Sequence, residues 1–324
     1  MHAIKVLVLV ASALMVLPAA AQEAYPAKTI TMVVGNLPGA SLEVYARLFA
    51  RKLSENMKHS VLVDFKPGAG TTIASSFIAK AAPDGYVIGL ISPSFTTAPL
   101  QYKTLPFDPI ESFAPISLTS SDAYVLMVNP SFAVKSVQEY IAYARANPGK
   151  INVGTTGAGA FNHLASAWLH LLTKTKATFI HYKGGSQVIA DVLGGQIQGS
   201  LNSIQLAKPL GAAGKVRIIG ITSAKRSAAM PDLPSFAEQG VTGYDALNWI
   251  GFIAPAKTPP AIVNRLNREF NAALRSDEIM STLTKTGGEP MGTTPEDFKR
   301  FLVDELARWK NLVREGNIDL ESGS

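Results

Sequence analysis

Short apolar runs alternate with segments of helical periodicity along most of this 324-residue chain. Residues 29–34 form an apolar run that predicts a buried strand, and residues 42–57 carry apolar side chains on one helical face. The same order returns in the middle of the chain, where residues 124–128 predict a strand and residues 136–146 a helix. Strands that alternate with helices favour right-handed βαβ units and a largely parallel sheet. The predicted fold class is therefore α/β.

The length of the chain predicts two domains, or one domain with a large insertion. A glycine-rich turn that leads into a helix occurs twice, at residues 35–41 and 155–161, which suggests two lobes of similar build. The formal net charge of +6 is spread along the sequence without a basic run. We therefore expect mild attraction for anions and no nucleic-acid partner. The absence of cysteine excludes thiol nucleophiles and thiolate metal sites.

The first 21 residues predict a cleavable secretory signal peptide. Lys5 supplies the positive charge, residues 6–16 form the apolar segment, and residues 19–21 are three alanines that fit the cleavage pattern. Cleavage after Ala21 would leave a mature chain that begins at Gln22. An uncleaved membrane anchor is the alternative, but the apolar segment is too short to span a bilayer. We expect a soluble protein of the periplasm.

The two glycine-rich turns are the strongest functional signal in the chain. A turn at the start of a helix presents backbone N–H groups that have no intrahelical acceptor, and the helix dipole adds partial positive charge there. Phosphate and carboxylate groups bind at such places. Each turn alone is more commonly an ordinary connection between a strand and a helix. Two of them in one secreted chain predict a small-anion site between two lobes.

Nucleotide and hydrolase chemistry fit these motifs poorly. Residues 157–159 begin like a dinucleotide fingerprint, but Asn162 occupies the position of the third glycine, and no Lys-Ser or Lys-Thr pair follows. Ser186 lies in a motif that lacks the closing glycine of a nucleophile elbow. A secreted hydrolase that acts on an anionic substrate stays an alternative, because catalytic triads can be assembled from distant residues.

Three titratable residues near the turns have a structural and a functional interpretation. His163 and His170 are separated by about 10 Å along a helix, which is too far to share one metal ion. We interpret His163 as a capping or core residue and His170 as a surface residue, and we expect neither a metal nor a cofactor. Glu43 either interacts with the dipole of its own helix, worth about 0.3–1 kcal/mol, or contacts a donor on the ligand.

A series of short motifs, each weak alone, extends over nearly the whole chain after the signal peptide. They are Tyr25-Pro26, Pro38-Gly39, Pro67-Gly68-Ala69-Gly70, Pro83-Asp84-Gly85-Tyr86, Pro106-Phe107-Asp108-Pro109, Asn129-Pro130-Ser131, Gly157-x-Gly159 with His163-Leu164, Tyr182-Lys183-Gly184, Leu193-Gly194-Gly195-Gln196, Pro231-Asp232-x-Pro234 and Trp249-x-Gly251. In order and spacing the series resembles the tripartite tricarboxylate transporter substrate-binding proteins, also called the Bug family.

This resemblance implies a two-lobed periplasmic binding protein of type II, with each lobe a mostly parallel sheet flanked by helices and a ligand cleft between the lobes. It places one lobe at residues 22–124 plus 245–324 and the other at residues 125–244. It implies a non-catalytic protein that captures a small carboxylate and docks on the subunits of an inner-membrane transporter. We expect a monomer. A protein that presents its ligand to a sensor kinase is the other open alternative.

The chain departs from the family pattern at several expected ligand contacts, namely Ala40, Glu43, Thr155, Ala160, His181 and Asn202. We therefore hypothesise a mono- or dicarboxylate ligand with an apolar body, which is either aliphatic or aromatic. Phe161 serves either as an apolar wall for that ligand or as a core residue. The candidate ligand-binding residues are Gly39, Ala40, Ser41, Glu43, Ser92, Thr155, Thr156, Gly157, Gly159, Ala160, Phe161 and Asn202.

Overall fold

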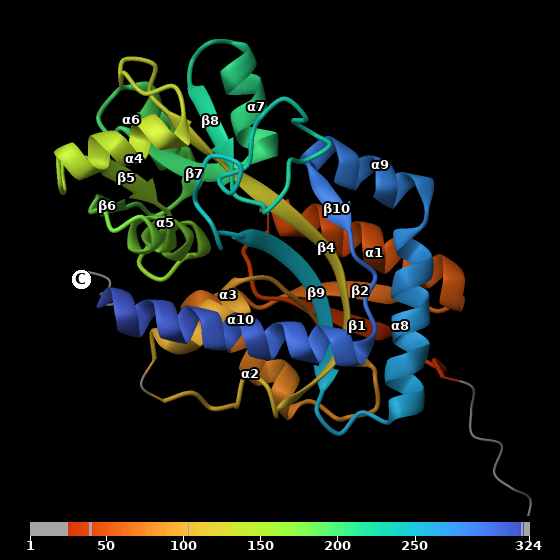
Figure 1. Ribbon diagram of the computed structural model, residues 1–324. Coiled ribbons are helices and arrows are strands. Elements are labelled where there is room, and N and C mark those ends of the chain that lie inside the picture. Colours follow the sequence, from red (N-terminus) through yellow and green to blue (C-terminus); the bar gives the residue numbers. More distant parts are fainter. Residues whose placement is uncertain (1–24, 39–40, 103, 319, 321–324) are drawn as a thin grey trace, which may run out of the picture.

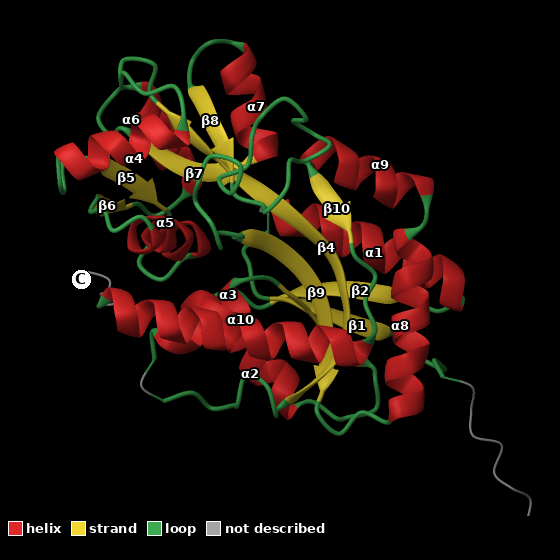
Figure 2. Cartoon of the chain, viewed as in Figure 1, coloured by secondary structure: helices red, strands yellow, loops and turns green. Residues whose placement is uncertain are grey.

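The structure is a computed structural model that describes residues 25–38, 41–102, 104–318 and 320. The predicted signal peptide lies outside the described residues, as do Gly39 and Ala40 of the first glycine-rich turn. The strands form one continuous sheet in the order β2-β1-β3-β9-β4-β7-β5-β6, with β8 and β10 also paired to β4 (Figure 1). Helices cover both faces of this curled sheet (Figure 2). The predicted α/β class is confirmed.

The first half of the sheet contains three parallel strands. Strand β1 (Ile30–Val34) pairs in parallel with β2 (Val61–Phe65) on one side and with β3 (Val87–Ile91) on the other. Helices α1 (Ser41–Met57) and α8 (Pro260–Leu274) bury their apolar faces in one core cluster with these strands. Helix α2 (Thr72–Lys80) packs in a second cluster with side chains of β9. Short helical turns are η1 (Ala69–Thr71), α3 (Ser94–Thr97) and η2 (Ala98–Leu100).

The second half repeats this arrangement. Strands β5 (Asn152–Thr155), β6 (Thr178–His181) and β7 (Gly199–Ser203) are parallel, whereas β8 (Arg217–Ile221) pairs antiparallel with β4. Helices α4 (Val137–Ala146) and α5 (Phe161–Leu172) contribute to one core cluster. Helices α6 (Gly185–Leu193) and α7 (Ile204–Ala212) contribute to the other. Each half therefore has its own buried layers of apolar side chains.

Two antiparallel strands join the halves. Strand β4 (Phe113–Val128) pairs with β9 (Leu247–Pro255) through residue 123 and with β7 from residue 124 onward. The sequence predicted a strand only over residues 124–128, so its first part, with the antiparallel pairing, is a finding of the structure. The change of pairing partner lies next to the lobe limit at residue 124, and the lobe limits themselves stay a prediction.

The last helix, α10 (Pro295–Gly316), contacts both halves of the molecule. Its Phe298 and Leu302 are buried in the cluster that contains α2, and its Trp309 and Leu312 are buried in the cluster that contains α5. Figure 1 shows this helix passing beside α3 and α5. Within the described residues, no helix combines the length and the apolar content needed to cross a bilayer.

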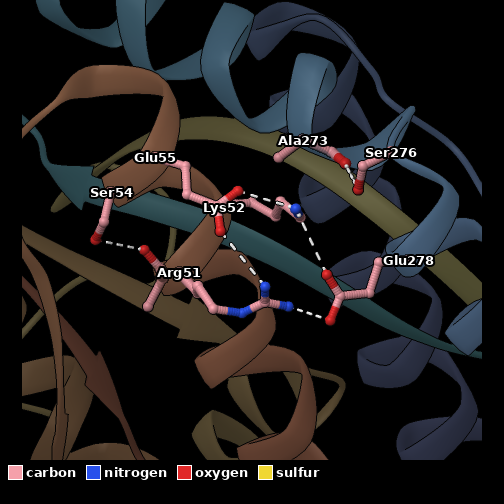
Figure 3. A network of polar contacts seen from close by, with 8 residues as sticks. Arg51, Lys52, Ser54, Glu55, Ala273, Ser276 and Glu278 are labelled. Carbon is pink, nitrogen blue, oxygen red and sulfur yellow. Dashed lines mark hydrogen bonds and ion pairs between the residues drawn. The ribbon is translucent and has the colours of Figure 1, made fainter.

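A polar network links α1 to α9 (Asp277–Thr286), which precedes the short strand β10 (Gly288–Pro290). Arg51 and Lys52 of α1 both pair with Glu278, and Lys52 also contacts Glu55 at 2.9 Å (Figure 3). Solvent-exposed ion pairs of this kind contribute little to stability, because water and salt screen the charges. The network joins α9 to α1, the helix whose N-terminus follows the first glycine-rich turn.

Candidate functional site

The second glycine-rich turn connects the end of β5 to the start of α5. Thr155, the last residue of β5, is fully buried and pairs across the sheet with His181. Their side chains share a hydrogen bond of 2.6 Å between Thr155 Oγ1 and His181 Nδ1. Asn202 of the neighbouring parallel strand β7 is also buried, and its Nδ2 donates to Ser200 Oγ at 2.6 Å. The turn and Asn202 thus share the carboxyl edge of parallel strands, where open α/β sheets bind ligands.

Several of the predicted anion donors in this turn already bond within it. Asn162 Oδ1 accepts hydrogen bonds from Thr156 N (3.2 Å) and Thr156 Oγ1 (3.1 Å). His163 Nδ1 accepts from Gly159 N at 3.0 Å, and Ala160 N donates to the carbonyl of Gly157. These bonds fix the shape of the turn. The sequence-based interpretation missed this role of Asn162, which the spacing of a polar amide just inside a helix start could have indicated.

Other donors at the start of α5 face no acceptor among the described residues. The N–H groups of Gly157 and Ala158 donate no hydrogen bond to another described residue. The N–H groups of the first three residues of α5 have no acceptor within the helix, because the residues four positions earlier lie outside it. Ala160 occupies the N-cap position with extended dihedrals (φ −63°, ψ 155°) but has no side-chain atom that could cap the helix. Gly157 has φ +132°, which only glycine adopts readily. The N-terminus of α5 is therefore an uncapped cluster of N–H donors.

The histidine beneath the turn is neutral at physiological pH. Burial lowers the pKa of His163 to about 4, and the neighbouring His181 adds to the shift. Their rings lie 4.8 Å apart. Because Nδ1 accepts the Gly159 hydrogen, the proton of the neutral ring is on Nε2. This arrangement confirms the interpretation of His163 as a capping or core residue.

His170 is buried, so the prediction of a surface residue was wrong. Its Nδ1 lies 2.7 Å from Thr175 Oγ1, its Nε2 lies 3.2 Å from Tyr140 Oη, and burial lowers its pKa to about 4. The physical reason is the packing of this face of α5 against α4 and β6, since the ring of His170 lies 5.8 Å from that of Tyr140 and 6.1 Å from that of Phe179. Polar side chains on such a helix are buried together with apolar ones.

The ring of Phe161 belongs to the core cluster of the second half. It makes edge-to-face contacts with Tyr124, at a centroid distance of 5.0 Å, and with Trp309, at 6.1 Å. This packing favours the core interpretation of its side chain over the ligand-wall interpretation. Its backbone N–H, the first of α5, stays a candidate donor.

The candidate residues of the first half lie at the carboxyl edge of β1 and β3. Helix α1 begins at Ser41, and Glu43 in its first turn pairs with Arg47 at 2.6 Å, one helical turn on. This pair fits the structural interpretation of Glu43. Ser92 is buried directly after β3, and its carbonyl accepts from Phe95 N at 2.8 Å. The two halves meet close by, because a β-carbon on Gly159 would lie only 2.4 Å from Gln101 Nε2.

The described residues also line cavities in other parts of the surface. Volumes of about 520 and 510 Å³ occur beside residues 99–109 and beside α7, and one of about 190 Å³ is lined by residues 223–227 together with Ala123 of β4 and Leu247 of β9. None of the candidate residues within the described part of the chain lines these cavities. The candidate site is therefore defined by its hydrogen-bond donors and its place at the strand ends.

Fold and site together define the class of two-lobed α/β solute-binding proteins. A family model described as the tripartite tricarboxylate transporter family receptor matches residues 45–318, and the chain belongs to this family. Its members are solute-binding receptors and not enzymes. The expected family membership is thereby confirmed.

Similar proteins include BugT of Bordetella pertussis, which is 32% identical over 92% of each chain. Among solved structures, Rpa4515 of R. palustris with adipate is 33% identical, with a TM-score of 0.79 over 91% of this chain and 99% of that one. MatC of Rhodopseudomonas palustris with bound malate is 26% identical, with a TM-score of 0.75 over 89% and 100% of the two chains. Both bound ligands are carboxylates.

Proposed function

We propose that this protein binds a small mono- or dicarboxylate between the N-terminus of α5 and the N-terminus of α1, and that it does so in the periplasm. The observation that carries the proposal is the uncapped start of α5, where Ala160 stands at the N-cap. The carboxylates held by Rpa4515 and MatC support the same ligand class. Delivery of the ligand by a monomer to an inner-membrane transporter completes the proposal.

The binding energy comes from charge-assisted hydrogen bonds. A bond from an N–H group to a carboxylate contributes about 1.5–3 kcal/mol, and the dipole of α5 favours a negative charge at its N-terminus. Gly157, Ala158 and the first turn of α5 supply the donors on one side. The start of α1 supplies them on the other.

The ligand body is a separate part of the proposal. An aromatic body was suggested by Phe161, but the ring of this residue packs against Tyr124 and Trp309. An aliphatic body therefore suits the site as well as an aromatic one. A thermal-shift screen of aliphatic and aromatic acids tests both, because a ligand at about 100 times its Kd adds about 2.7 kcal/mol to stability. Amines or sugars that raise the Tm while no acid does would overturn the proposal.

The variant Ala160→Asp tests directly whether the ligand binds at the start of α5. The new carboxylate would cap the N–H groups of the first turn of α5, which typically adds about 0.5–2 kcal/mol of stability. The same carboxylate would occupy the place of the ligand. We therefore expect a higher Tm and a loss of carboxylate binding in one variant, measured by thermal unfolding and calorimetric titration. Loss of binding could then not be attributed to misfolding.

Ser276→Asp is the matched control, because Ser276 is the N-cap residue of α9 and its side chain makes no capping bond. Its hydroxyl donates to the carbonyl of Ala273 at 2.7 Å instead (Figure 3). This variant introduces the same charge at a helix start and should leave binding unchanged. An Ala160→Asp protein that still binds the acid with wild-type affinity would remove α5 from the site.

A further inference from the structure

A short segment of the first half reaches over to the second half beside the candidate site. Turn η2 follows α3, and its last residue, Leu100, packs against the core cluster that contains α5 and the end of α10. The next residue, Gln101, is held by a hydrogen bond of 2.9 Å from its N–H to the carbonyl of Ala98. Leu100 thus anchors the segment in the opposite half, and the backbone of Gln101 has a defined position.

The side chain of Gln101 lies directly over Gly159. A β-carbon built on Gly159 would be 2.4 Å from Nε2, 2.9 Å from Cδ and 3.0 Å from Cγ of Gln101. Side-chain carbons do not approach other atoms so closely, and Gly159 also has φ +69°. The positive φ favours glycine at this position, and the missing side chain leaves room for the amide of Gln101 against the backbone of the turn.

The amide of Gln101 is available for a ligand. Gln101 is exposed, and among the described residues its side chain makes no recorded hydrogen bond. The N–H of Gly159 beneath it is occupied by His163 Nδ1. The unoccupied donors of α5 begin two residues further along the chain, at Phe161. A neutral amide with donor and acceptor atoms therefore covers one side of the anion-binding turn.

We propose that Gln101 is a specificity-determining residue of the ligand site, which closes the turn at residues 157–161 from the first half and donates a hydrogen bond to the bound carboxylate. This inference rests on the proposed function of the same site. The uncharged amide of Gln101 can donate a hydrogen bond to a carboxylate ligand without electrostatic repulsion. A glutamate side chain, which has nearly the same shape, would repel a negatively charged ligand. The residue at position 101 therefore influences which ligand charge the site binds.

Gln101→Glu and Gln101→Ala, titrated with adipate and with malate, test the proposal. The isosteric Gln101→Glu change should weaken carboxylate binding at least about tenfold, which corresponds to about 1.4 kcal/mol, and more than Gln101→Ala does. Gln138→Glu is the matched control, because Gln138 is exposed on α4 and its side chain makes no recorded hydrogen bond in the described part of the chain. That variant should bind like the wild type.

The outcomes separate this proposal from the proposed function. Wild-type binding that Gln101→Glu leaves unchanged would overturn the role of Gln101 alone. Absence of carboxylate binding by the wild type would overturn the proposed function, and the role of Gln101 with it. A weaker affinity in both Gln101 variants with an unchanged Gln138→Glu control would support both.

A second measurement tests the contact without any ligand. Gln101 Cγ lies 3.0 Å from the β-carbon position of residue 159, so the two β-carbons would be within about 4.5 Å, which suits a disulfide. The chain has no cysteine, so the pair Gln101→Cys and Gly159→Cys can be oxidised without competing thiols. We expect a disulfide in this variant and none in the pair Gln101→Cys and Gln138→Cys. A folded 101–159 variant that does not oxidise would overturn the proposal.

Discussion

Asp122 has its carboxylate at the place where β4 passes from one half of the sheet to the other. Asn248 Nδ2 donates to both of its oxygens at 3.0 Å. Burial nevertheless raises the pKa of Asp122 to about 6, and the bond from Asn248 offsets only part of this effect. The folded protein therefore holds a proton on Asp122 more tightly than the unfolded chain, whose carboxyl has the ordinary pKa of 3.8.

This shift has a defined sign for stability. Well below pH 3.8 the carboxyl of Asp122 is protonated in both the folded and the unfolded state, so it does not change the free energy of unfolding. As the pH rises to about 6 the unfolded chain loses the proton first, so the folded state becomes less stable by up to about 1–3 kcal/mol. Asp122→Asn removes this cost and keeps an acceptor for Asn248. We expect the variant to have a higher Tm than the wild type at pH 7.5 and a much smaller difference in Tm at pH 4.

Thermal unfolding of both proteins at the two pH values checks this prediction. The comparison with the wild type at each pH cancels the effect of other titrating groups, among them His163 and His170, whose lowered pKa values destabilise the fold as the pH falls below 6.5. A lower Tm for Asp122→Asn at pH 7.5 would show that the charge itself is needed at this position.

Single residues also show which features of the candidate site could be predicted from the sequence. The cradle-like turn at residues 155–161 could be predicted because its signal is local, a strand followed by glycines and a helix. The roles of Asn162 and His163 within it could not, because they depend on the direction of two side chains in the folded turn. The prediction for His170 was wrong for a similar reason, since its burial depends on Tyr140 of α4 and Phe179 of β6, which reach it only in the folded chain.

At the scale of elements, α10 carries a buried carboxylate that contacts side chains of both halves. Glu305 is buried, and its Oε2 accepts from Trp309 Nε1 at 2.9 Å and from Trp249 Nε1 at 3.4 Å. Its Oε1 pairs with Arg308 at 2.7 Å. Burial raises the pKa of Glu305, and Arg308 lowers it in part. This carboxylate contacts Trp249 of β9 in the first half and Trp309, which is buried in the second.

Arg308→Ala should therefore destabilise the protein in a pH-dependent way. Removal of the partner leaves a buried carboxylate unpaired, and because Arg308 is partly exposed we expect a loss of about 1–3 kcal/mol at pH 7.5. Glu305 has a raised pKa, so at pH 5 more of it is protonated and the loss should be smaller. Urea unfolding at both pH values measures the difference, with Lys310→Ala, an exposed neighbour, as control. An equal loss at both pH values would contradict the role of the charge.

Most helices and buried parallel strands could be predicted from their periodicity, whereas the connecting elements could not. The first part of β4 contains Ser117 and Thr119, which interrupt any apolar run. Inside the protein these hydroxyls find partners, since Thr119 Oγ1 donates to the carbonyl of Ile250 and Ser117 Oγ donates to Asn271 Oδ1. Because the partners of Ser117 and Thr119 lie far away in the sequence, this part of the strand carries no local signal.

At the scale of the whole molecule, β4, β9 and α10 hold two similar halves together, and the candidate site lies where the strand ends of both halves come close. The family could be predicted from a series of weak motifs that extends over most of the chain, whereas the ligand class stays a proposal. The contact between Gln101 and Gly159 could not, because it joins segments that meet only in the folded chain. The departures from the family pattern, Ala160 above all, are expected to set the choice of ligand.

Calorimetric titration of the mature protein with small acids and their neutral amides tests the central claim most directly. Malate, adipate and an aromatic acid, each paired with its amide, keep the ligand body constant and remove only the charge. We expect saturable one-to-one binding of at least one acid and no binding of the matching amide. Amides that bind as tightly as their acids, or a complete absence of binding by the acids, would contradict a carboxylate site at the start of α5.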